Sequence, residues 1–233
     1  MQLFFSKDIN YDIAFLDKTE SFHAAKVMRM RKGDEIYLTD GIGTIAKGVL
    51  IAAHPDDCEV RIIERSQSFK DSKYFLHIAM ALPKNPERFE WFVEKATELG
   101  IDEITPVICS RSNRDHIRSE RIYKVIVSAA KQAKQAFFPK LNEAIGLDEF
   151  TTIPFDGKKI IAHCEQGHKT QLSELIVKGN RSLVLIGPEG DFTDEEILLT
   201  SVSGFEQCSL GESILRTETA GVFVCSAFRF VNL

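Results

Sequence analysis

The chain of 233 residues has no apolar run near the ~20 residues that a membrane-spanning helix needs. Its start, MQLFFSKDIN, has no basic segment followed by a long apolar core, so we expect no secretory signal peptide there. The five cysteines are scattered singly without a CxxC pair, which favours reduced thiols over disulfides or a zinc site. We therefore expect a cytoplasmic protein that binds no metal.

Two common nucleotide-binding motifs are also missing. The sequence contains no GxxxxGK[ST], and Gly41-Ile42-Gly43 is not followed by the third glycine of GxGxxG. Composition is ordinary for a globular protein, with 44% hydrophobic and 27% charged residues. These observations argue against a P-loop or dinucleotide-binding protein. The class of ligand has to be inferred from other features of the sequence.

An overall basic charge is lacking, since the formal net charge is −5. The charges are unevenly distributed: residues 105–140 carry eight basic and two acidic residues. A local basic stripe can bind phosphates on an acidic protein, because the field at the site matters more than the total charge.

Two glycine loops are present in the last third of the chain. The apolar run Ser182–Ile186 predicts a buried strand that leads into Gly187-Pro188-Glu189-Gly190, and Thr193 with Glu196 predicts a capping box behind it. A second strand, Phe205–Leu210, leads into GESILRTETA. The first loop alone would be explained by a tight turn. Together, two strands that each end in a glycine loop before a helix predict an α/β ligand site.

The pattern of elements predicts two domains. Residues 1–70 show closely spaced short strands with glycine turns, typical of a small β-barrel, and a helix over Glu20–Arg31. Residues 71–233 alternate strand and helix, typical of an α/β domain, and the polar run 67–73 predicts a linker. The helix Glu218–Phe230 is apolar on nearly all sides. It is predicted to be buried on all sides, either in the core or partly against a second subunit.

A third strand, Lys158–Cys164, ends in His163-Cys164-Glu165-Gln166-Gly167. A histidine next to a cysteine suggests a nucleophile or a metal ligand, but no second ligand pair follows at a useful spacing. We therefore predict a third loop beside the two glycine loops, because strand ends of such sheets converge on one crevice.

The segments LIGPEGDFTDEEI and LGESILRTETA closely resemble the two signature loops of the SPOUT methyltransferases, and more narrowly those of the RsmE family. That family methylates N3 of a uridine in 16S ribosomal RNA. FHAAKVMRMRKGDEI is similar to part of its PUA-like RNA-binding domain, with Ala24 in place of a second histidine. KATELGIDEITPV and ERIYKVIVSAAKQAKQAFFP resemble its central segment, without an arginine usual after Gln132. Asp191 stands where the family commonly has a second glycine.

The resemblance implies a PUA-like β-barrel over residues 1–70. It implies a SPOUT domain over 71–233, with a parallel sheet and a deep trefoil knot that pattern reading alone would not predict. It also implies a homodimer through the C-terminal domain, 16S RNA of the small subunit as partner, and S-adenosylmethionine as cofactor. Apolar or backbone-rich positions of the two loops are suited to hold that cofactor: Ile186, Gly187, Pro188, Gly190, Leu210, Gly211, Ile214 and Leu215.

Methylation of N3 requires loss of a weakly acidic proton, which a nearby cation would assist. Arg216 is the predicted catalytic cation, and Glu218 could orient it or accept a proton. The alternative for this segment is a helix cap at Thr217.

Basic and polar residues in both domains are the predicted RNA contacts: His23, Arg29, Arg31, Lys32, Arg111, Arg114, Lys131 and Lys134. The alternative for Arg29–Lys32 is an ordinary solvated helix end. Two other functions share these features. One is a SPOUT enzyme that acts on another RNA such as transfer RNA, and the other is a non-catalytic RNA-binding dimer.

Overall fold

The computed structural model describes residues 2–9, 11–68, 74–165 and 167–233. The chain forms two compact units, one of Met1–Asp71 with Val127–Phe138 and the other of Ser72–Ile126 with Pro139–Leu233. Residues 69–73 of the predicted linker lie outside the described residues, so the boundary between residues 70 and 71 stays a prediction. Within the described ranges, no helix has both the length and the apolarity needed to cross a bilayer.

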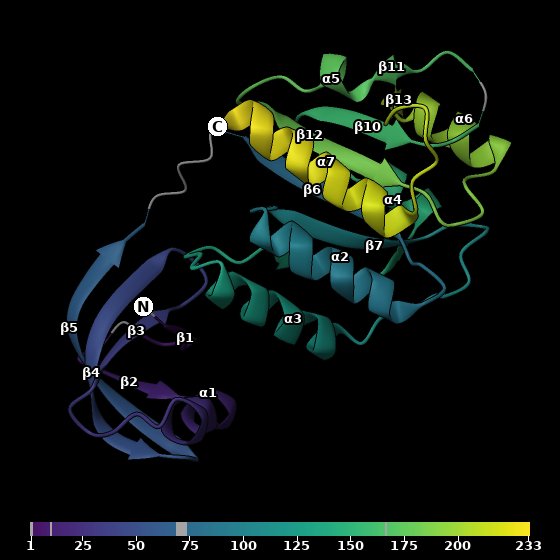
Figure 1. The fold of residues 1–233 in the computed structure, drawn as a ribbon. Helices are drawn as coiled ribbons and strands as arrows, with labels where there is room; N and C mark the ends of the chain where they lie inside the picture. The colour runs from purple at the N-terminus through teal and green to yellow at the C-terminus, as the bar shows by residue number, and fades with distance from the viewer. Residues whose placement is uncertain (1, 10, 69–73, 166) are drawn as a thin grey trace. The chain divides into compact units, whose positions relative to one another are not determined.

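The first unit is built on a five-stranded sheet that curls into a half-barrel (Figure 1). Its strand order is β1-β3-β4-β5-β2, and every pairing is antiparallel except β1 with β3. The Ser6 hydroxyl, just after β1, donates to the Phe15 carbonyl of β2 at 3.0 Å and so links the two edge strands. The strands are β1 Leu3–Phe5, β2 Ile13–Leu16, β3 Glu35–Thr39, β4 Thr44–His54 and β5 Asp57–Gln67.

The helix predicted over Glu20–Arg31 is replaced by two shorter elements, α1 Lys18–Phe22 and the π-helical turn η1 His23–Val27. The carboxylate of Asp17 caps α1 by accepting from the Glu20 backbone N–H, so the helix begins two residues early. The wider π turn then rotates the side chains that follow. The two elements are contiguous, so a helix is present as predicted, but it becomes π-helical after Phe22 and ends at Val27 rather than at Arg31.

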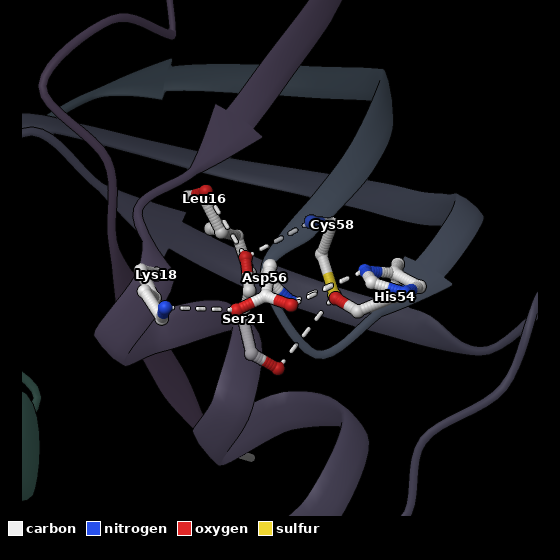
Figure 2. Close-up of polar contacts among 6 residues, drawn as sticks. All are labelled: Leu16, Lys18, Ser21, His54, Asp56 and Cys58. Carbon is white, nitrogen blue, oxygen red and sulfur yellow. Dashed lines mark hydrogen bonds and ion pairs between the residues drawn. The ribbon is translucent and has the colours of Figure 1, made fainter.

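A group of polar contacts fastens α1 to the hairpin of β4 and β5 (Figure 2). The Ser21 hydroxyl donates to the Leu16 carbonyl at 3.0 Å and accepts from the Cys58 N–H at 2.9 Å. At the surface, Lys18 Nζ lies 3.2 Å from a carboxylate oxygen of Asp56 in the hairpin turn. Because Ser21 is buried, its two hydrogen bonds hold α1 more firmly than the exposed ion pair does.

The second unit is an eight-stranded parallel sheet, which confirms the predicted α/β class. The strand order is β11-β13-β10-β12-β6-β7-β8, and β9 also pairs with β7. The trefoil knot implied by the resemblance stays a prediction. The strands are β6 Phe75–Ala81, β7 Glu103–Ile108, β8 Lys140–Leu141, β9 Ile145–Gly146, β10 Lys158–Ala162, β11 Thr170–Gln171, β12 Arg181–Ile186 and β13 Phe205–Ser209.

Helices cover both faces of this sheet. On one face, α2 and α7 lie side by side (Figure 1). Gly221 permits their close approach, since a Cβ there would lie 2.4 Å from Met80 Cε and 2.5 Å from the Phe92 ring. On the other face, residues of α4 join a buried cluster with Phe192 and Phe205. The helices are α2 Pro86–Glu98, α3 Ser119–Gln132, α4 Leu147–Thr152, α5 Leu172–Leu175, α6 Asp194–Val202 and α7 Thr217–Asn232.

Within one chain the last helix is not buried on all sides, so only the alternative of partial burial against a second subunit remains, as a prediction. Val224 and Phe228 of α7 are buried, whereas Phe223 is 44% and Phe230 79% exposed. Composition alone cannot distinguish a fully buried helix from one with an exposed apolar stripe.

A buried histidine in β6 makes the stability of this unit depend on pH. His77 Nε2 lies 2.7 Å from the Thr105 hydroxyl, and the ring packs edge-on against Phe150. Burial is the main cause that lowers the pKa of His77 to about 4 from 6.5. The unfolded state therefore takes up a proton below pH 6.5 that the folded state does not bind until about pH 4.

As the pH decreases from 7 through this window, we expect the free energy of unfolding of the wild type to fall by about 3 kcal/mol more than that of a His77→Gln variant. Urea unfolding at several pH values measures this difference. Identical pH dependence in the two proteins would contradict the assignment to His77.

Candidate functional site

Three loops at the carboxyl ends of neighbouring strands line one cavity of about 570 Å³ in the second unit. They follow β10, β12 and β13, and the first turn of α7 completes the wall. The prediction of a third loop is confirmed, because His163, Cys164 and Glu165 line this cavity with the two glycine loops. The volume is that of a small-molecule or cofactor site.

Every residue predicted to bind the cofactor lines this cavity. The glycine loops contribute Ile186, Gly187, Pro188, Gly190, Leu210, Gly211, Ile214 and Leu215. The structure therefore brings the whole predicted set together, while the identity of the ligand stays a proposal.

The first glycine loop is tied to the third loop through Asp191. This residue has a left-handed φ of 58°, a conformation that glycine adopts more readily than other residues. Its carboxylate accepts from the backbone N–H groups of Cys164 at 2.7 Å and Phe192 at 2.9 Å. The aspartate therefore adopts a glycine-like conformation and forms two hydrogen bonds that glycine could not form.

Arg111 supports the same loop. Its guanidinium donates to the carbonyls of Gly190 at 2.8 Å and Phe192 at 3.1 Å. In the structure Arg111 thus positions the first glycine loop, while the predicted RNA contact of this exposed residue stays a prediction. No local pattern revealed this role, because the partner carbonyls lie 79 and 81 residues away in sequence.

The second glycine loop joins the first at the start of α7. The Thr217 hydroxyl donates to the Gly187 carbonyl at 2.9 Å and is buried. The cap at Thr217, considered from the sequence, is not formed: Arg216 is the N-cap residue and its side chain makes no capping bond. By contrast, the predicted capping box of Thr193 and Glu196 is confirmed.

The two predicted catalytic residues have different surroundings. Arg216 is exposed and lines the cavity, and its guanidinium makes no hydrogen bond or ion pair with any residue that the structure describes. Glu218 is 7% exposed and pairs with Arg88, with 3.7 Å between Nε and Oε1. Arg88 also contacts Glu189 of the first loop at 3.5 Å. The structure thus pairs Glu218 with Arg88, which sequence reasoning missed, and not with Arg216.

The third loop lacks the features of a reactive thiol. His163 Nε2 lies 3.1 Å from the Gln207 side-chain oxygen, and burial lowers the pKa of His163. Burial, followed by the charge of Asp191, raises the pKa of the Cys164 thiol and so disfavours the nucleophilic thiolate. Throughout the described part of the chain, no cluster of three or more His, Cys, Asp or Glu residues could hold a metal ion.

Four predicted RNA contacts are exposed cations of the first unit. Arg29, Arg31, Lys32 and Lys134 extend from loops or helix ends, and their side chains form no ion pair with another described residue. They are free to bind phosphates. In the second unit, the half-buried Arg114 donates to the His116 carbonyl at 3.4 Å and lines a separate hollow.

Two other predicted RNA contacts have side chains that contact residues of the first unit itself. Lys131 forms an ion pair with the buried carboxylate of Glu20, and its side chain is only 14% exposed. The ring of His23 packs against Phe4, with 5.5 Å between the centroids. Both residues therefore serve the packing of this unit.

Comparison with known proteins gives matches over both parts of the chain. Residues 70–229 match the family model of an RNA methyltransferase domain, and residues 16–63 match that of an RNA methyltransferase PUA domain. The ribosomal RNA small subunit methyltransferase E of Bacillus subtilis (strain 168) is 29% identical over 224 residues, covering 91% of this chain and 87% of that protein.

Two solved structures are similar over their whole length. A probable rRNA-methyltransferase from Porphyromonas gingivalis has a TM-score of 0.93 and 34% identity, covering 100% of this chain and 98% of that one. A putative methyltransferase from Legionella pneumophila, in complex with the bound cofactor SAM, has a TM-score of 0.90 and 27% identity at the same coverage.

Proposed function

Since this chain belongs to the RNA methyltransferase family, we propose that it transfers a methyl group from S-adenosylmethionine to N3 of a uridine in 16S ribosomal RNA. The observation that carries this proposal is the cavity in which both glycine loops and the free Arg216 guanidinium meet. The names of the curated relatives support the small ribosomal subunit as the substrate. We propose the cytoplasm, where ribosomes assemble, as the compartment.

The cavity fits this cofactor in charge and in hydrogen-bonding capacity. Four carboxylates line it, from Glu165, Glu189, Asp191 and Glu212, against two cationic side chains. Such a balance favours a ligand that carries a sulfonium and an ammonium group. His163 Nδ1 is buried without a hydrogen-bond partner in the described chain and belongs to a residue of the cavity wall, so a polar ligand atom could satisfy it.

The bound cofactor would supply a methyl group on a positively charged sulfur. The chain supplies position and charge: backbone-rich loops hold the ligand, and Arg216 stabilises negative charge that develops on the uracil as N3 loses its proton. Arg29, Arg31, Lys32 and Lys134 are free to neutralise RNA phosphates in the first unit.

Methyl transfer from labelled S-adenosylmethionine tests this function in vitro. The purified protein should modify small subunits that lack the methyl group, and mass spectrometry should locate the label on a single uridine of 16S RNA. Transfer RNA and free 16S RNA serve as comparison substrates. Faster transfer to transfer RNA would assign a different substrate, and absence of transfer to all three would contradict the proposal.

We also propose a homodimer through the exposed stripe of α7 that contains Phe223 and Phe230. Phe223→Glu is expected to shift the protein from dimer to monomer, because a carboxylate cannot be buried in an apolar interface without a large cost. Light scattering at micromolar concentration measures the mass. Leu198→Glu on α6, also at an exposed apolar position, is the control and should remain dimeric. A monomeric wild type would contradict this proposal. A substitution of Phe228 would not test the interface, because this side chain is 1% exposed and its loss would disturb the core of one chain.

A further inference from the structure

Another hollow, of about 360 Å³ and distinct from the one lined by Arg114, opens between the first turns of α2 and α7. Most of its side chains are polar, and one is aromatic. It is lined by Asn85, Glu87, Arg88, Trp91, Glu218 and Thr219.

Glu218 is the unusual member of this group. Its side chain is 9% exposed, and Oε2 has no hydrogen-bond donor among the described residues, while Oε1 lies 3.7 Å from Arg88 Nε. A buried carboxylate oxygen without a donor costs free energy. Glu218 lines the hollow but Oε2 is itself buried, so a rotation of the carboxylate would present Oε2 to a ligand with an N–H group there.

Trp91 provides an apolar surface at the same place. It is 43% exposed although it is a large aromatic residue, and it is the sole tryptophan of the chain. Unpaired RNA bases bind proteins by stacking on such rings and by hydrogen bonds along their edges. An exposed indole next to a buried acceptor therefore fits a nucleobase with an N–H edge and disfavours a phosphate, which the carboxylate would repel.

We propose that this hollow binds the target uracil, with its ring stacked on Trp91 and its N3–H donating to Glu218 Oε2. This inference rests on the proposed methyl transfer and adds the residues that recognise the base. Uracil fits because its N3 carries a proton, whereas N3 of cytosine is an acceptor that a carboxylate repels. Arg88 supplies a positive charge beside the carboxylate and near the carbonyl oxygens that gain charge when N3 ionises.

The hollow and the cofactor cavity share a wall. Arg216 and Thr217 line the cavity, and the next two residues of the same helical turn line the hollow. Arg88 in the hollow also contacts Glu189 in the cavity wall. The hollow therefore adjoins the cofactor cavity along the first turn of α7.

In the reaction, Glu218 accepts the proton as the N3–H bond breaks. The electron pair left on the imide forms the new bond to the methyl carbon, and the pair of the former C–S bond remains with the sulfur. Glu218 later releases the proton to water, so charge and atoms balance. Glu218 thus acts as the general base, with Arg88 as its positioning residue.

Emission from Trp91 tests the site directly in the full chain without cofactor. Uridine 5′-monophosphate should quench it saturably. Cytidine 5′-monophosphate and 3-methyluridine 5′-monophosphate, which lack the N3 proton, should bind at least about 10-fold more weakly, as expected when a buried acceptor loses its donor. Glu218→Gln should weaken uridine binding and abolish methyl transfer. Glu174→Gln on α5, a change at an exposed carboxylate that lines neither the hollow nor the cofactor cavity, should alter neither.

Three outcomes would overturn the inference. The first is no saturable quenching by uridine monophosphate at tens of millimolar, and the second is equal quenching by all three nucleotides. The third is emission that responds to protein dilution but not to uridine, which would assign Trp91 to the subunit interface. If uridine quenches as predicted but small subunits are not methylated, the uracil site stands and the proposed function fails. If small subunits are methylated but uridine does not quench selectively, the proposed function stands and the uracil site fails.

Discussion

Gly211→Val is expected to abolish measurable binding of S-adenosylmethionine while the protein remains folded. Gly211 begins the second glycine loop with a φ of +118°, a conformation that a β-branched residue does not adopt without strain. Valine would force the loop into another path and remove one wall of the cavity. We expect affinity to fall more than about 100-fold, which corresponds to roughly 3 kcal/mol.

The cause is the backbone and not crowding, because no atom lies within 4 Å of the position that a Cβ at Gly211 would occupy. Gly204→Val provides a matched control. Gly204 also has a positive φ, of +85°, and open space around it, but it lies outside the cavity in the turn before β13. Titration calorimetry and thermal unfolding on both variants separate lost binding from lost stability. Unchanged affinity in Gly211→Val would place the cofactor elsewhere.

Arg216→Ala is expected to reduce turnover about 100-fold, the scale seen when one group that stabilises a developing oxyanion is removed. Binding of cofactor and RNA should stay within a few fold, because the guanidinium acts mainly in the transition state. The free, exposed side chain of Arg216 at the cavity agrees with such a role. Single-turnover rates on unmodified small subunits, together with both binding constants, measure the effect.

Arg118→Ala is the control for Arg216, because Arg118 is also exposed but lies at the separate hollow lined by Arg114. It should leave the single-turnover rate unchanged. A wild-type rate in Arg216→Ala would remove Arg216 from the reaction. A loss of cofactor affinity as large as the loss of rate would assign it to binding instead.

Local patterns predicted the alternation of strands and helices, the two glycine loops and the helix cap at Thr193. Each depends on residues close in sequence, and the loops meet because parallel strands end at one edge of the sheet. The positive φ of Asp191 could also have been predicted, since aspartate tolerates this conformation better than most residues and stands where glycine is common.

The supporting contacts could not be predicted in this way. Arg88 reaches Glu189 over 101 residues, and Thr217 reaches Gly187 over 30. Such pairs depend on how loops from different strands come together, which hydrophobic periodicity does not encode. The same holds for α7, because apolar residues on every side do not reveal which stripe the sheet leaves exposed.

Mass spectrometry of 16S RNA tests the proposed methylation in cells, with a strain without this protein, complemented with the wild type or with Arg216→Ala. We predict that one N3-methyluridine disappears in the deletion strain. It should return with the wild-type gene, and it should remain largely absent with the variant. A 16S RNA that keeps all its methylated uridines in the deletion strain would show that this protein does not methylate 16S RNA.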